Sequence, residues 1–177
     1  QEWRGDAKKS AGGHFMELGI HLIDLTRWFF GNIKTVSAQM ETLYFDMKPL
    51  EDNGMAILKS ENKALISLHS SLTQWKNTFS FEIIGEDGYL TIDGIGQSYG
   101  TEKLIFGKRD YIAPFNDSIT EFRGSDRSWY LEFIEFVQAI NEKRNPLGNS
   151  EDGVEAMKIV YAAYESSNTN RTVSIKE

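Results

Sequence analysis

Hydrophobic and polar residues follow two different periods along the chain, and these periods separate the expected helices from the expected strands. Residues 12–31, "GGHFMELGIHLIDLTRWFFG", are apolar at helical spacing and predict a helix that ends at Gly31 with a left-handed cap. Alternating or β-rich segments bounded by turn residues predict strands with one polar face. These segments are 33–45, 55–72, 79–94 with a hairpin turn at Glu86-Asp87-Gly88, 102–112 and 171–175.

Two further helices are expected near the end of the chain. Residues 126–145 carry apolar side chains at helical spacing, and residues 150–167 begin with Ser150 as the expected N-cap and acidic residues in the first turn. Helices around hairpin-linked strands are typical of an α+β fold with an open, predominantly antiparallel sheet and helices packed on one face. With no internal repeat or shift in composition, residues 1–177 are expected to form a single domain.

Composition and charge narrow the classes of function. The chain has 177 residues, of which 40% are hydrophobic, enough for a substantial core. Its net charge of −7 argues against nucleic acid as a partner, and no apolar run is long enough to predict a membrane span. The absence of cysteine excludes disulfides and thiolate metal sites and is compatible with a cytoplasmic protein.

A glutamate, a histidine and an aspartate lie in the middle of the first apolar helix. Glu17, His21, Asp24 and Trp28 follow one another at i, i+4, i+7 and i+11, so a regular helix places them on one stripe. One interpretation is a core histidine that is hydrogen-bonded to the two carboxylates. The other is an acid/base pair that lines a cleft, and spacing alone leaves both open. Gly19, costly in mid-helix, predicts the close approach of another backbone.

The motif around His21 resembles a known family. "SAGGHFMELGIHLIDLTRWFFG", with its Gly-Gly pair and Gly-x-His-x-x-Asp, is similar to the first helix of the C-terminal domain of the Gfo/Idh/MocA oxidoreductases. The segments "IIGEDGYLTIDG" and "NSEDGVEAMKIVYAAYESSNTNRTVSI" extend the resemblance over nearly the whole chain. It implies a dehydrogenase for a sugar, nucleotide-linked sugar or polyol, which uses NAD or NADP bound by an N-terminal Rossmann domain.

The resemblance also assigns candidate site residues. It implies catalytic roles for His21, as the proton donor or acceptor, and for Glu17, which occupies the family's acidic position. Asp24 matches the family's aspartate, as a substrate contact or as a hydrogen-bonding support. Trp3 and Arg4 lie just upstream and are candidates for substrate contact, although an exposed terminal loop is the commoner fate of such residues.

The chain shows no dinucleotide site of its own. The segment "GIGQSYG" at 94–100 lacks the third glycine and follows a hairpin, so it is expected to be a loop, and we expect no metal site. We therefore expect the substrate and oligomerisation half of an enzyme, inactive by itself, without its dinucleotide domain and paired with copies through the sheet. His69 is expected on an exposed or subunit-facing sheet surface, and His14 at the cleft mouth. The alternative is a non-catalytic sugar-binding or assembly module with the same fold.

Overall fold

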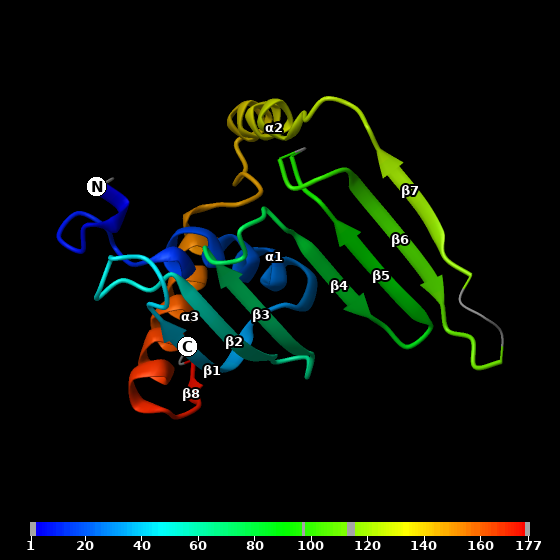
Figure 1. The fold of residues 1–177 in the computed structure, drawn as a ribbon. Coiled ribbons are helices and arrows are strands. Elements are labelled where there is room, and N and C mark those ends of the chain that lie inside the picture. Colours follow the sequence, from blue (N-terminus) through cyan, green and yellow to red (C-terminus); the bar gives the residue numbers. More distant parts are fainter. Residues whose placement is uncertain (1–2, 97, 113–115, 176–177) are drawn as a thin grey trace. The chain divides into compact units, whose positions relative to one another are not determined.

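The computed structural model describes residues 3–96, 98–112 and 116–175, and it divides the chain into two compact units. The first unit comprises Gln1–Thr73 and Pro146–Glu177, and the second comprises Gln74–Asn145. Each unit has its own four-stranded antiparallel sheet (Figure 1). The α+β class and the antiparallel pairing predicted from the sequence are confirmed. The strands are divided between two separate sheets.

The first unit carries the helix with the candidate site. Its helical segments are η1 (Trp3–Gly5), the π-helical turn η2 (Phe15–Gly19), α1 (Ile20–Phe30) and α3 (Ser150–Thr169). Its strands are β1 (Ile33–Glu41), β2 (Asn53–Ser60), β3 (Leu65–Ser71) and β8 (Val173–Ser174), in the order β3-β2-β1-β8. The short closing strand expected at 171–175 is therefore present and lies beside β1.

The core of this unit lies between one face of the sheet and the helices α1 and α3. Alternate strand residues such as Val36 and Leu58 are fully buried, and they form one cluster with Ile23 of α1 and Val160 of α3. The intervening residues face away from this core, as period-2 alternation requires. The packing of helices on one face of this sheet thus follows the predicted arrangement.

The second unit contains β4 (Ser80–Ile84), β5 (Gly88–Asp93), β6 (Glu102–Lys108), β7 (Ser118–Phe122) and α2 (Ser128–Glu142). Its strands are paired in chain order, β4-β5-β6-β7. The predicted hairpin at 79–94 is confirmed, because Ile84 pairs with Tyr89 across a turn closed by the Gly85 N–H and the Gly88 carbonyl at 2.8 Å.

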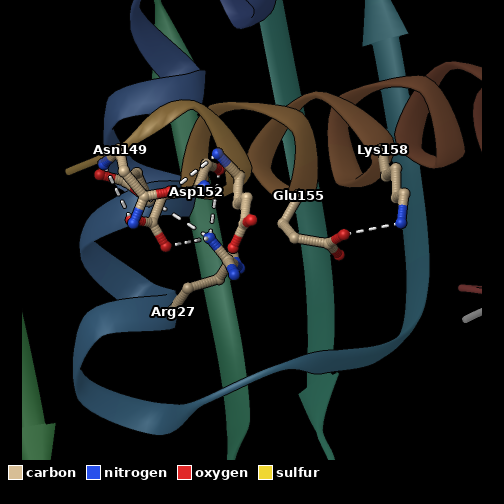
Figure 2. Close-up of polar contacts among 7 residues, drawn as sticks. Arg27, Asn149, Asp152, Glu155 and Lys158 are labelled. Carbon is tan, nitrogen blue, oxygen red and sulfur yellow. Dashed lines mark hydrogen bonds and ion pairs between the residues drawn. The ribbon is translucent and has the colours of Figure 1, made fainter. Parts of the chain in front are cut away.

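Several local predictions were wrong. The N-cap of α3 is Asn149 and not Ser150: the Asn149 side chain accepts the Asp152 N–H at 3.3 Å, and the Asp152 carboxylate accepts the Asn149 N–H at 3.1 Å (Figure 2). The first strand ends at Glu41 and not at residue 45. At Gly19, an added Cβ would meet the Phe15 ring at 3.1 Å and not another backbone.

Candidate functional site

The helix that carries the candidate site begins with a π turn. The sequence predicts a regular helix from residue 12, whereas the structure places η2 at Phe15–Gly19 and the regular helix α1 only from Ile20. In a π turn the hydrogen bonds join residues five apart, so the four-residue spacing between Glu17 and His21 no longer guarantees contact. Such turns occur frequently at functional sites, which agrees with the position of Glu17 on this one.

The four residues of the predicted stripe, Glu17, His21, Asp24 and Trp28, are all exposed. The opposite side of the same helix is buried through Ile23 and Thr26. Within the described part of the chain, His21 forms neither a hydrogen bond nor an ion pair, whether with Glu17, with Asp24 or with another residue. The interpretation of His21 as a hydrogen-bonded core histidine is therefore wrong for this structure.

Glu17 lies beside the two candidate residues of the N-terminal segment. The Glu17 carboxylate forms an ion pair with the Arg4 guanidinium, with 2.5 Å between Oε1 and Nε. The same guanidinium lies over the ring of Trp3, 5.2 Å from its centroid, and Trp3 is 57% exposed. The structure thus brings Trp3, Arg4 and Glu17 together, in an arrangement that presents an aromatic face, a cation and a carboxylate to one region of surface.

Asp24 is connected to a support of the helix. Its carboxylate lies 3.8 Å from Arg27, a residue that the sequence analysis missed. Arg27 Nη1 also donates to the carbonyl oxygen of Asp152 at 3.2 Å and lies 3.7 Å from the Asp152 carboxylate, as Figure 2 shows. Through these contacts the Arg27 side chain, which is only 12% exposed, connects α1 to the first turn of α3. The ion pair between Asp24 and Arg27 could have been predicted from their three-residue spacing on a helix.

The other two histidines lie in contrasting environments. His14 is buried and not at an open cleft mouth. Burial lowers its pKa, and this effect outweighs the negative charges of Glu17, Glu51 and Asp52, which raise it. It is therefore neutral near pH 7. His69 is exposed on β3, opposite Met55 of β2, on the sheet face that α1 and α3 leave uncovered.

Two features bear on a metal or cofactor site. Within residues 3–96, 98–112 and 116–175, no group of three or more His, Cys, Asp or Glu residues has the geometry to hold a metal ion. Gly94, Gly96 and Gly100 have positive φ and lie in the loop between β5 and β6, as predicted, with residue 97 outside the described part. None of the described helices has the length and apolar character to span a bilayer.

Comparison with known proteins identifies the family. The model of the oxidoreductase family's C-terminal alpha/beta domain, named for Gfo/Idh/MocA, matches residues 1–175. The chain belongs to the Gfo/Idh/MocA family. The resemblance seen around His21 is thereby confirmed over almost the whole sequence.

Two curated relatives of this Gfo/Idh/MocA domain are named as dehydrogenases. Scyllo-inositol 2-dehydrogenase (NADP(+)) IolW of Bacillus subtilis is 24% identical, over 98% of this chain and 52% of its own length. Glucose-6-phosphate 3-dehydrogenase of the same organism is 26% identical, over 98% of this chain and 53% of its own length. The chain therefore spans about half the length of the curated relatives that it matches.

Solved structures share the fold. A levoglucosan dehydrogenase in complex with NADH and L-sorbose superposes with a TM-score of 0.86 at 18% identity, over 100% of this chain and 54% of that chain. A putative NADPH-dependent oxidoreductase from Desulfitobacterium hafniense superposes with a TM-score of 0.84 at 20% identity, over 98% of this chain and 51% of that chain. At these identities the likeness establishes the fold of the Gfo/Idh/MocA C-terminal domain.

Proposed function

We propose that this chain is the substrate-binding half of a nicotinamide-dependent dehydrogenase that acts on a sugar, nucleotide-linked sugar or polyol. In this proposal His21 is the proton donor or acceptor, and a separate dinucleotide-binding domain of the same protein holds NAD or NADP. The relatives named for scyllo-inositol, glucose 6-phosphate and levoglucosan support this substrate class.

The observation that carries the proposal is the exposure of His21 on a helix whose other side is buried. An imidazole titrates near neutrality, so it can take a proton from a hydroxyl group or return one to a carbonyl group. A histidine that served only packing would lie on the buried side with Ile23 and Thr26. His21 instead presents its ring to solvent and has no bonding partner within the described residues.

A nicotinamide held by that separate domain would supply the hydride acceptor or donor for the reacting carbon. The described residues of this chain do not form a strand, glycine-rich turn and helix N-terminus in succession, so they do not fit the pyrophosphate of such a cofactor. The chain's own contribution is the proton at the reacting oxygen, through His21. Because proton and hydride leave from neighbouring atoms, we place the reacting hydroxyl group against the exposed ring of His21.

The remaining candidate residues bind and orient the substrate in this proposal. Trp3 offers an aromatic face to a sugar ring, and the paired Arg4 and Glu17 offer a donor and an acceptor to hydroxyl groups. Asp24 accepts a substrate hydrogen bond while Arg27 restrains it from the side. The Arg4–Glu17 ion pair holds both side chains in one orientation, which lowers the entropic cost of ordering them when a substrate binds.

The experiment is a turnover assay of the full-length gene product with scyllo-inositol, glucose 6-phosphate and levoglucosan, each with NAD and with NADP. The proposal predicts reduction of the nicotinamide, followed as absorbance, with at least one pair. Binding of these compounds without turnover would instead favour the non-catalytic sugar-binding module. A protein that neither binds nor turns over any of these compounds would contradict the proposed substrate class.

A further inference from the structure

A single buried residue holds the start of the candidate helix. The carboxylate of Glu51 accepts the backbone N–H of Gly13 at Oε2 (3.2 Å) and the N–H of Phe15 at Oε1 (3.0 Å). The backbone carbonyl of the same residue accepts the N–H of His14 at 2.9 Å. Three consecutive N–H groups, which a helix start leaves without intrahelical partners, are thus satisfied by one residue 36 to 38 positions away along the chain.

The glycine pair allows this close approach. A Cβ on Gly13 would overlap the Glu51 carbonyl oxygen and come within 2.5 Å of Glu51 Oε2. A Cβ on Gly12 would come within 2.5 Å of the hydroxyl oxygen of Tyr164. The Gly-Gly pair ahead of the helix is therefore required by the side chains that pack against the helix start.

Tyr164 holds the Glu51 carboxylate from its other side. This residue of α3 donates its hydroxyl to Glu51 Oε1 at 2.8 Å, and Glu51 is only 6% exposed. Burial and the neighbouring Glu51 charge both raise the pKa of Tyr164, so its hydroxyl stays protonated and remains a donor. The carboxylate is thereby fixed between the helix start and α3.

The anchored segment lies directly before the candidate site. The Glu17 N–H donates to the Gly13 carbonyl at 3.0 Å, so the position of Gly13 sets the position of Glu17. Regular α-helix begins at Ile20, immediately after the π turn, and carries His21. A shift at residues 13–15 therefore propagates through η2 to both candidate residues.

We propose that Glu51 is a positioning residue, which places Glu17 and His21 by binding the three N–H groups at the start of their helix. This inference rests on the proposed function, because the two side chains that it places are the proposed acid/base and substrate-binding groups. Glu51 itself is buried behind the helix start and acts through the backbone.

Glu51→Gln in the full-length protein is the direct test. Glutamine keeps the size and one acceptor oxygen. Its NH2 group is a donor, however, and cannot accept the backbone N–H that the second carboxylate oxygen of Glu51 accepts. Asp52→Asn is the matched control, because Asp52 is the neighbouring buried carboxylate and binds the N–H groups of Leu43, Tyr44 and Phe45, not those of the helix. Tyr164→Phe is a milder second variant, which removes one donor and leaves both backbone bonds in place.

Turnover is measured at saturating substrate, well below each variant's melting temperature and per folded molecule. Because a displaced catalytic group loses rate steeply with distance, Glu51→Gln is expected to lower kcat by roughly tenfold or more. Tyr164→Phe should give a smaller loss in the same direction. Asp52→Asn should leave kcat within about twofold of the wild type, although it lowers the melting temperature as well.

A spectroscopic measurement separates this inference from the proposed function. In the full-length protein, the ring C2–H signal of His21 is identified in the proton NMR spectrum as the signal that His21→Ala removes. The His21 signal should move in Glu51→Gln and stay in place in Asp52→Asn. An unmoved His21 signal, together with a kcat equal to that of Asp52→Asn, would overturn the positioning role. A wild-type protein without turnover would remove the proposed function, while the His21 signal would still decide whether Glu51 places the helix.

Discussion

Replacing Asp52 with asparagine tests how the loop between β1 and β2 is held. Asp52 is fully buried, and its carboxylate accepts the backbone N–H groups of Leu43 (2.8 Å), Tyr44 (2.8 Å) and Phe45 (2.9 Å). Burial alone would raise its pKa, but these donors, with the side chain of Asn53, lower it from 3.8 to about 2. At about 1.4 kcal/mol per pH unit, the ionised carboxylate contributes about 2 kcal/mol to folding.

The sign of the pH dependence follows from the lowered pKa. The stabilisation is fully present above the ordinary pKa of 3.8 and is lost as the pH falls towards 2. Asp52→Asn is therefore expected to lower the free energy of unfolding by about 2 kcal/mol or more at pH 7, and by about half as much at pH 3. Urea unfolding of the chain, followed by tryptophan fluorescence at both pH values, measures this difference.

Ser166→Ala is the matched control for that measurement. Ser166 is equally buried, but its hydroxyl forms neutral hydrogen bonds with the Ala38 N–H at 2.9 Å and the Arg171 carbonyl at 2.7 Å. Its loss should cost about the same at pH 7 and pH 3, because no ionised group is removed. The reasoning would be refuted if Asp52→Asn lowered the free energy of unfolding equally at both pH values, or by less than about 0.5 kcal/mol at pH 7.

Two further predictions concern the chain by itself. The 177-residue chain should fold without binding NADH, because its described residues offer no glycine-rich helix start for the pyrophosphate; micromolar binding in calorimetry would contradict this. The chain should also self-associate through the uncovered face of the first sheet, where Met55, Ile57 and Leu65 are 60%, 56% and 77% exposed. Ile57→Lys should then shift the sedimentation coefficient towards the monomer, whereas a wild-type monomer at every concentration would count against this interface.

Local patterns predicted most of the elements correctly. Alternation in residues 55–72 corresponds to β2 and β3, and helical spacing in 126–145 and 150–167 corresponds to α2 and α3. The capping residue of α3 was also within reach of the sequence, because Asn149 and Asp152 have the spacing of a capping box. Signals that act within a few residues were therefore sufficient for these elements.

Contacts between distant residues explain what the sequence did not predict. The strand expected at 33–45 stops at Glu41 because the Asp52 carboxylate takes the N–H groups of residues 43–45. The π turn follows a helix start that is held by Glu51, a partner more than 35 positions away. The division of the chain after Thr73 has no Gly or Pro cluster to mark it. For the site, the stripe indicated which residues share an exposed face, but the Arg4–Glu17 and Arg27–Asp152 pairs depend on the fold.

The central claim is that His21 transfers the proton, and single-turnover kinetics of His21→Ala in the full-length protein test it most directly. His69→Ala is the matched control, because His69 is likewise exposed and lies on the uncovered sheet face. We predict that His21→Ala lowers the rate of the chemical step by about 100-fold or more, while the affinity for NADH and the melting temperature change little. His69→Ala should keep the wild-type rate. A folded His21→Ala protein with a near-normal rate would contradict the claim.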